Sequence, residues 1–420
     1  MRKSISRAAA MGAVSLMATA VLAGCGSDSD NESGGDATSP AQASSEILFW
    51  DPYPQHQDGS DWDNVVKSCA PEGTTIVRTS AAQTDLFNQL TTAVREGTAP
   101  DVAMLDNPVM PEAVAAGLVA KAEDAGISAD GLNENLVGPG VVDGVAYGVP
   151  LGSNALGIYY NVEILDKAGV DPASITDWDS LDAAIKKVVD SGAKGITFSG
   201  IAGEEGVFQF LPWFWGSGAS FDDIASADAV SAGALQSNWI GEGWAPMSAV
   251  TDNQSASWDL FLTGEYGFAE NGSWQAAGAA AADGFTTGVI AIPAKAGGVA
   301  PVPTGGEFAI APVQNENAEQ HYKNAQDIIS CLTTGDTAKL AVETLGYLSA
   351  NPDVRAEQVK ENPLWEPWVE IVEGAQGRTS DAGADYVNIS AQLSEAIQAS
   401  LNAAGKADAV KQAFEEAAGK

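Results

Sequence analysis

Residues that could carry out catalysis are few and scattered in this sequence of 420 residues. Its histidines, His56 and His321, lie far apart in the chain, and neither HExxH nor CxxC occurs, so no spacing typical of metal ligands is present. No GxSxG sequence provides a serine nucleophile, and no GxGxxG or P-loop sequence occurs to hold a phosphate group. Two carboxylates could serve a glycoside hydrolase, but among 56 Asp and Glu residues such a pair arises by abundance alone. The sequence predicts a protein that is not an enzyme and that uses neither a metal nor a cofactor.

Tryptophan is the residue type whose placement favours a binding function. Eleven occur, and those at expected strand ends are Trp50, Trp213, Trp215 and Trp274. An indole ring suits the apolar C–H face of a pyranose, and nearby amides and carboxylates suit the hydroxyl groups on its rim. Trp274 is therefore predicted to contact a ligand, whereas Trp178 begins a predicted helix and is predicted to lie in the core. Trp50 fits either place, and we expect only one of Trp213 and Trp215 to face a ligand.

Short strands alternate with amphipathic helices along the chain. The predicted strands are 46–50 (EILFW), 74–79 (TTIVRT) and 100–105 (PDVAML), and the predicted helices between them are 62–69 and 84–97. The order returns where Thr176 or Asp177 can cap a helix that ends near Gly192 and precedes the strand GITFSG. This alternation predicts an α/β fold with mainly parallel sheets and helices on both faces. Ligands in such folds bind at the carboxyl ends of the strands.

The chain begins with the features of an exported lipoprotein. A positively charged start precedes an almost uncharged apolar run of seventeen residues, which predicts a signal peptide over residues 1–24. A transmembrane anchor is the alternative, but such a helix needs roughly 20 apolar residues. The sequence LAGC at residues 22–25 resembles the lipobox of bacterial lipoproteins, which implies that Cys25 becomes the first mature residue and carries a diacylglyceryl group. Residues 25–45 are then a lipidated cysteine and a disordered linker, because that stretch has no aromatic or branched apolar side chain.

Bulk composition limits the partners and the size of the folded part. Lys and Arg number 20 against 56 Asp and Glu, a net charge of −36, so no nucleic acid partner is expected. No apolar run after the signal is long enough to span a membrane, so the lipid alone would attach the protein to one. The roughly 375 residues from 46 onward exceed one comfortable core and predict two lobes. Cys69 and Cys331 remain after lipidation, and an even pair in an exported protein favours a disulfide over buried free thiols.

Five stretches resemble, in the same order, the extracellular solute-binding proteins of carbohydrate ABC transporters, in the branch similar to maltose-binding protein. The third and fourth of them are the most specific, and together the five cover nearly the whole chain. They are 46–50, 90–106, 142–169 continuing into 177–188, 261–274, and 288–293 with 305–312.

The resemblance implies a periplasmic-binding-protein fold of two α/β lobes joined by a hinge. The chain would cross the hinge near 151–156, 289–293 and 347–350, so that lobe 1 comprises 46–152 and 294–346 and lobe 2 comprises 153–293 and 347–420. A ligand would bind in the cleft and close it, because its full contacts form only when both lobes meet. Both Cys69 and Cys331 would fall in lobe 1, where a disulfide leaves the hinge free.

The resemblance also implies ligand-binding residues by position. Those that match cleft-facing positions of the family are Trp50, Asp51, Asp106, Asn107 and Asn154. Trp274 matches the sugar-stacking tryptophan of the family, and Gly306 and Glu307 lie on a loop that approaches the ligand in relatives. One departure disfavours maltodextrin: the C-terminal helix, 388–401, lacks the aromatic cluster of maltodextrin binders, and Tyr386 just upstream is only a partial substitute.

Together these features predict a monomeric receptor that is lipid-anchored on the extracytoplasmic face of a bacterial cell membrane. It would capture a neutral sugar or oligosaccharide and deliver it to the permease subunits of an ABC importer. Two alternatives stay open. The same fold could bind a cation such as a polyamine, which Asp51, Asp106 and Glu307 near the cleft would suit, or the protein could be a secreted glycoside hydrolase.

Overall fold

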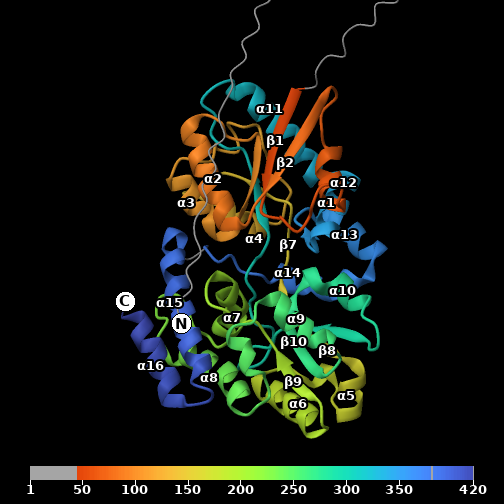
Figure 1. Ribbon diagram of the computed structural model, residues 1–420, viewed down its shortest axis with the longest axis vertical. Coiled ribbons are helices and arrows are strands. Elements are labelled where there is room, and N and C mark those ends of the chain that lie inside the picture. The colour runs from red at the N-terminus through yellow and green to blue at the C-terminus, as the bar shows by residue number, and fades with distance from the viewer. Residues whose placement is uncertain (1–44, 380–381, 420) are drawn as a thin grey trace, which may run out of the picture. The chain divides into compact units, whose positions relative to one another are not determined.

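The computed structural model describes residues 45–379 and 382–419, and every structural statement below concerns these residues (Figure 1). The predicted signal peptide, Cys25 and nearly all of the predicted linker lie outside them. Ser45, expected to end the linker, instead begins the first strand. The described residues contain no helix whose length and hydropathy would let it span a bilayer.

A five-stranded sheet forms the centre of the first lobe. Its strands, in spatial order, are β2 (Thr74–Ser80), β1 (Ser45–Asp51), β3 (Val102–Asp106), β12 (Glu307–Ile310) and β6 (Val149–Pro150). Because successive side chains of a strand point to opposite faces, Val102 and Met104 of β3 enter one core while Ala103 and Leu105 enter another. Helices therefore cover both faces of this sheet, as the sequence predicts.

Five helices supply most of the covering of the first lobe. One face is covered by α1 (Asp61–Ser68), α11 (Ala318–Thr333) and α12 (Gly335–Leu345), and the other by α2 (Gln83–Glu96) and α3 (Met110–Ala115). The predicted strands and helices of this region are confirmed within two residues at each end. Helix α2 stops at Gly97, whose φ of 74° is a left-handed conformation that glycine adopts readily.

A four-stranded sheet forms the centre of the second lobe. Its strands, in spatial order, are β11 (Thr287–Ile290), β8 (Leu156–Asn161), β10 (Tyr266–Gly272) and β9 (Lys194–Thr197). The longer helices of the lobe are α5 (Val162–Ala168), α6 (Trp178–Asp190), α7 (Glu204–Gly216), α8 (Ala227–Gly241), α9 (Gln254–Leu262), α14 (Glu366–Glu373), α15 (Tyr386–Asn402) and α16 (Ala407–Ala418). As predicted, Asp177 caps the start of α6, where it exchanges capping hydrogen bonds with Ser180. Trp178 lies in the core, also as predicted.

Shorter elements connect these layers. The remaining helices and strands are α4 (Glu134–Val137), α10 (Ala276–Ala280), α13 (Pro352–Glu361), β4 (Val141–Val142), β5 (Val145–Ala146), β7 (Gly152–Ser153) and β13 (Leu348–Ser349). The 3-10 turns are η1 (Asn107–Val109), η2 (Gly138–Gly140), η3 (Pro172–Ser174), η4 (Met247–Val250), η5 (Ser273–Gln275), η6 (Pro363–Trp365) and η7 (Gly383–Asp385).

Both sheets are mixed rather than mainly parallel, which corrects one part of the predicted fold. In the first sheet β1 runs parallel to β2 and β3, but β12 is antiparallel to both β3 and β6. In the second sheet only the pair β9 and β10 is parallel. Alternation of strands and helices along the chain predicts that neighbouring strands run parallel. Strand β12, however, follows the strands of the second sheet in sequence. The chain therefore returns to the first sheet from the side of the second lobe, and β12 runs opposite to β3.

Two of the predicted hinge crossings lie side by side. Strand β7 in the first crossing pairs antiparallel with β13 in the third. The exact residue limits of the lobes stay a prediction.

A disulfide joins Cys69, at the end of α1, to Cys331 in α11. Both residues belong to the first lobe, so this bond ties together two parts of that lobe that are 262 residues apart in sequence.

Candidate binding site

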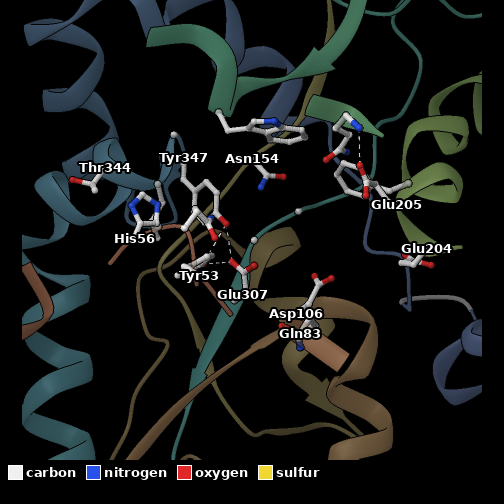
Figure 2. Close-up of a pocket in the computed structure, with 18 of the residues that line it drawn as sticks. Tyr53, His56, Gln83, Asp106, Asn154, Glu204, Glu205, Glu307, Thr344 and Tyr347 are labelled. Carbon is white, nitrogen blue, oxygen red and sulfur yellow. Dashed lines mark hydrogen bonds between the residues drawn. The ribbon is translucent and has the colours of Figure 1, made fainter. Parts of the chain in front are cut away.

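A cavity of about 830 Å³ is lined by residues from both lobes (Figure 2). Its size lies in the range of pockets that hold small molecules. The first lobe contributes the loop after β1, the end of β3, the start of β12 and the end of α12. The second lobe contributes the start of α7, the turn after β10, η6 and the loop that carries Arg378.

Two tyrosines converge on one carboxylate at the first-lobe wall. Tyr347 donates its hydroxyl hydrogen to Oε2 of Glu307 at 2.7 Å, and Tyr53 donates to the same oxygen. Burial, and after it the Asp106 carboxylate, raise the pKa of Glu307 to about 7, although the two tyrosine hydrogen bonds and Arg378 act in the opposite direction. Figure 2 shows the three side chains pointing toward one another. Glu307 therefore sits close to its protonation midpoint at neutral pH.

Arg378 balances the charges of two further carboxylates. Its guanidinium contacts Asp106 Oδ1 at 2.6 Å and Glu204 Oε1 at 2.8 Å, and it is almost completely buried. Burial alone would lower the pKa of Arg378, but the two carboxylates raise it by more, so the guanidinium stays charged. Because Asp106 ends β3 and Glu204 begins α7, this arginine links the two lobes at the edge of the cavity.

Aromatic rings form much of the second-lobe wall. The centroids of Phe208 and Trp274 lie 6.3 Å apart, and the Arg378 guanidinium lies 5.0 Å from the Phe208 centroid. The glycine of the G-x-W sequence has a steric reason: a Cβ on Gly272 would lie 1.9 Å from the Trp274 ring. The ring therefore packs directly on the backbone at the end of β10, and Trp274 keeps part of its surface at the cavity.

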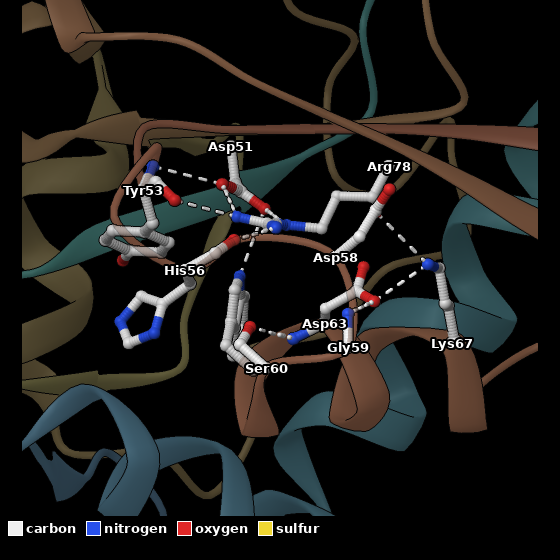
Figure 3. A network of polar contacts seen from close by, with 10 residues as sticks. Asp51, Tyr53, His56, Asp58, Gly59, Ser60, Asp63, Lys67 and Arg78 are labelled. Carbon is white, nitrogen blue, oxygen red and sulfur yellow. Dashed lines mark hydrogen bonds and ion pairs between the residues drawn. The ribbon is translucent and has the colours of Figure 1, made fainter.

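The first-lobe loop after β1 is held by a buried arginine on β2 (Figure 3). Arg78 pairs with Asp51 and also donates to the carbonyl oxygens of Tyr53 and His56. Asp51 in turn accepts from the Tyr53 amide and from Trp62 Nε1, both at 3.0 Å. Burial lowers the pKa of His56, and the Arg78 charge lowers it further, so this cavity histidine is neutral at pH 7.

Five of the eleven predicted ligand-binding residues line the cavity: Asp106, Asn154, Trp274, Gly306 and Glu307. The two glycines before β12 permit close packing there. Gly306 has a φ of 90°, and a Cβ on Gly305 would lie 1.7 Å from the Asn154 side chain. The predicted residues at strand ends and those in the Gly-Gly loop therefore line the same cavity.

The other six predicted residues do not line the cavity, and packing explains each. Asp51 is buried against Arg78, and Trp50 packs in the core of α2 and α3. The side-chain amide of Asn107 donates to the Gly306 carbonyl, and Tyr386 donates to Glu204. Trp213 and Trp215 are both buried in α7, where Trp213 Nε1 donates to Glu270 at 2.9 Å and Trp215 packs on Phe221. The expectation that one of the pair faces the ligand therefore finds no support.

Several lining residues were missed by sequence reasoning. The main ones are Tyr53, His56, Gln83, Phe208, Thr344, Tyr347, Trp365 and Arg378. The sequence prediction rests mainly on tryptophans and acidic residues, and it leaves out Tyr53, Tyr347 and Arg378. A signal was available for Tyr53 and His56, because both follow β1 directly, at the carboxyl end of a central strand. Among the described residues, no three His, Cys, Asp or Glu side chains are grouped so that they could hold a metal ion.

Comparisons with known proteins place this architecture. The family model described as bacterial extracellular solute-binding protein matches residues 70–367. A binding protein of Brucella abortus is 26% identical over 196 residues, which are 43% of this chain and 46% of that protein. The chain therefore matches about half the length of the curated relatives.

Two solved structures agree with the fold over most of the chain. The cyclic alpha-maltosyl-1,6-maltose binding protein from Arthrobacter globiformis has a TM-score of 0.70 at 24% identity, covering 89% of this chain and 97% of that one. UgpB from Mycobacterium tuberculosis, in complex with glycerophosphocholine, has a TM-score of 0.73 at 18% identity, covering 90% and 97%. At these identities the two likenesses establish the two-lobe fold alone.

Proposed function

Because the chain belongs to the bacterial extracellular solute-binding proteins, we propose that its cavity captures a neutral sugar or oligosaccharide for delivery to an ABC importer. The observation that carries this proposal is the pairing of two unlike walls. Trp274 and Phe208 offer apolar rings on one side, and Glu307 with its tyrosines offers oxygens on the other. A pyranose has an apolar face and a hydroxyl rim, so it matches both walls at once.

The neighbouring structures support a sugar without fixing it. One binds cyclic alpha-maltosyl-1,6-maltose and the other is in complex with glycerophosphocholine, so the shared fold accepts more than one ligand class. The choice of a sugar for this chain therefore rests on the cavity itself. Family and neighbours are binding proteins, and we propose that this chain likewise performs no chemistry on its ligand.

A cationic solute is the second candidate, and the charge of the cavity favours it. Five carboxylates line the cavity, namely Asp106, Glu204, Glu205, Glu307 and Glu343, whereas its lining includes one arginine and no lysine. Arg378 offsets two of the five. A salt titration separates the candidates, because screening weakens the binding of a cation and leaves that of a neutral sugar nearly unchanged.

A thermal-shift screen tests the proposal directly. We would use the full chain with Cys25→Ser, which blocks lipidation, and glucose, galactose, xylose, maltose, cellobiose and maltotriose, with spermidine as the control. A ligand at a hundred times its Kd adds roughly 2.7 kcal/mol to the folded state, a clear rise in Tm. A rise in Tm with one class of sugar supports the proposal. A rise in Tm with spermidine alone would mean that the ligand is a cation rather than a sugar. Hydrolysis of a bound oligosaccharide during long incubation would favour the glycoside hydrolase.

The anchor and the location are also proposals. We place the mature protein on the extracytoplasmic face of the membrane as a monomer held by lipid on Cys25, facing the permease subunits of its importer. The wild-type chain should then fractionate with membranes and the Cys25→Ser chain should not. Equal membrane association of both chains would contradict lipid anchoring.

A further inference from the structure

The first-lobe wall offers a ligand hydrogen-bond acceptors only, although it contains two tyrosine hydroxyl groups that could have donated. Each tyrosine hydroxyl has a single hydrogen, and both Tyr53 and Tyr347 donate theirs to Oε2 of Glu307. The two hydroxyl oxygens lie 3.3 Å apart and keep only lone pairs for other partners. An ionised Glu307 has no hydrogen to offer. These three side chains can therefore bind a ligand only through hydrogens that the ligand supplies.

The second oxygen of Glu307 is the one that is available to a ligand. Oε2 already accepts two hydroxyl hydrogens, whereas no described residue is hydrogen-bonded to Oε1. Glu307 is partly exposed and lines the cavity, so a ligand there can reach the carboxylate. When Glu307 takes up a proton, Oε1 is the oxygen with room for it. The ligand-facing oxygen then changes from an acceptor to a donor.

Charged and titratable groups on four elements act on this carboxyl. Tyr53 approaches from the loop after β1, and Tyr347 from the end of α12. Asp106 stands directly across from Glu307 in the pairing of β3 with β12. Arg378 comes from the second lobe, on a loop held beside residues 302–304 by backbone hydrogen bonds of Gln376. Arg378 keeps Asp106 paired, so the like charge next to Glu307 is reduced but not removed.

From this arrangement we infer that Glu307 determines specificity in the cleft: as a carboxylate it selects ligands that donate a hydroxyl hydrogen to the first-lobe wall, and its protonation releases them. The inference rests on the proposed function, because it assumes that the cavity holds a hydroxylated ligand. The inference adds to the proposed function a control of ligand affinity by pH.

The expected size of the effect follows from the position of the equilibrium. The pKa of Glu307 lies near 7 because burial and Asp106 disfavour the charged form. If only the ionised form binds, the apparent Kd rises about tenfold between pH 8 and pH 6. At pH 7 about half of the protein molecules carry a proton on Glu307, and they must lose it before the ligand binds. About half a proton is therefore released per ligand bound at pH 7.

The first test needs no ligand. Glutamate labelled with ¹³C at the δ-carbon is introduced into the full Cys25→Ser chain and followed by NMR from pH 4 to pH 9. A resonance that titrates near pH 7 and is missing from the Glu307→Gln variant supports the inference. In Tyr347→Phe, which loses one donor to the carboxylate, the midpoint should move to higher pH. Titration of Glu307 at the ordinary value of about 4.5 would overturn the inference whatever the ligand.

The second test measures affinity by calorimetry with the sugar that gives the largest shift in the panel above. Wild type should lose about tenfold in affinity from pH 8 to pH 6, and Glu307→Gln, which cannot ionise, should bind more weakly at pH 8 than wild type binds at pH 6, without pH dependence. Glu242→Gln is the matched control, since Glu242 is exposed and does not line the cavity. A wild-type affinity that is constant over this range would overturn the inference and leave the proposed function standing. Silence of every panel sugar would overturn the proposed function and the selection of hydroxyl donors together, while the NMR titration would still decide whether protons switch the acceptor.

Discussion

The two walls of the cavity are built on different principles. The first-lobe wall consists of polar groups at the ends of β3 and β12, each fixed by partners such as Tyr53, Tyr347 and Arg378. The second-lobe wall consists largely of rings, with Trp274 resting on the backbone of Gly272. Polar groups give direction and selection, because a misplaced hydrogen bond is costly, whereas rings give contact area with little directional demand. From this difference we expect the first lobe to select the ligand and the second lobe to supply most of the apolar contact area.

The two lobes each contain a glutamate with a raised pKa, in different surroundings. Glu307 lies at the cavity with two tyrosine donors, whereas Glu270 on β10 lies in the second-lobe core. Glu270 accepts from Trp213 Nε1 through Oε2, and its Oε1 has no partner among the described residues. Burial raises the pKa of Glu270 to about 8, and the Trp213 hydrogen bond lowers it by less. Glu270 is thus protonated at neutral pH without any access to ligand.

The largest pH-dependent effect is expected at this core glutamate. A carboxyl whose pKa is higher in the folded than in the unfolded state stabilises the fold below pH 4.5, and the contribution is lost as pH rises through 8. Wild type should therefore lose about 3 to 4 kcal/mol relative to Glu270→Gln between pH 5 and pH 9, from about 1.4 kcal/mol per pKa unit. Urea unfolding of both proteins at several pH values measures this. Parallel pH profiles of the two proteins would show that Glu270 is not buried as described.

The next effect concerns the arginine that links the walls. Arg378→Met leaves Asp106 and Glu204 without their cation. Removing one partner of a fully buried pair costs roughly 3 to 5 kcal/mol, and because the carboxylates are a quarter to a third exposed we expect about 2 to 3 kcal/mol. Chemical unfolding of the unliganded protein gives this value. Lys295→Met is the control, since Lys295 pairs with Asp228 on the surface and should change stability by less than about 1 kcal/mol.

Trp274→Ala should weaken sugar binding at least tenfold, because it removes the ring that we propose stacks on the ligand, a contact worth roughly 0.5 to 1.5 kcal/mol beyond the lost area. The Tm of the unliganded protein should change little, since the ring lies partly exposed at the cavity. Calorimetry and thermal unfolding of the same sample separate the two quantities.

Trp178→Ala provides the opposite pattern. This ring is buried and donates to the Pro293 carbonyl at 3.0 Å, so its loss should cost roughly 3 to 5 kcal/mol of stability with sugar affinity retained. If Trp274→Ala instead lost stability like Trp178→Ala, the second-lobe wall would be core rather than binding surface.

The smallest expected effect tests how the ring is seated. Gly272→Ala places a methyl group where the Trp274 ring now lies, so the ring must move. We expect a threefold to tenfold loss of sugar affinity, smaller than the loss from removing the ring, and overpacking that costs roughly 1 to 3 kcal/mol of stability. An unchanged affinity in calorimetry would mean that the ring position does not matter for binding.

Asp51 and Asp106 show how far the sequence determines the site. Both follow a central strand of the same sheet, and both are predicted to reach the ligand. Asp106 does line the cavity, but Asp51 is captured by Arg78 on the neighbouring strand. The local sequence predicts that a carboxylate lies at the end of a strand. Which arginine pairs with that carboxylate depends on the three-dimensional arrangement of the strands and loops around it. Strands, helix caps and strand-end acids could be predicted, whereas Arg378, which is 272 residues from Asp106, could not.

Aromatic residues in α7 show a second limit. The stretch VFQFLPWFW is apolar apart from Gln209, so helical periodicity does not show which face is buried. In the structure the ring that reaches the cavity from this helix is Phe208, and both tryptophans are enclosed by the second-lobe core. Counting tryptophans did not indicate which ring of this helix lines the cavity, because the size of a ring gives neither its depth nor its direction.

The disulfide between Cys69 and Cys331 can form only after most of the chain has been synthesised. The covalent ring that it closes contains the whole four-stranded sheet, since β8 to β11 lie between the two cysteines. The four strands of the second-lobe sheet must therefore be synthesised before the first lobe can be completed. Closing so long a loop removes roughly 5 kcal/mol of chain entropy from the unfolded protein. The two parts of the first lobe are joined only after the chain has returned to it, and helices α14, α15 and α16 of the second lobe are made after that.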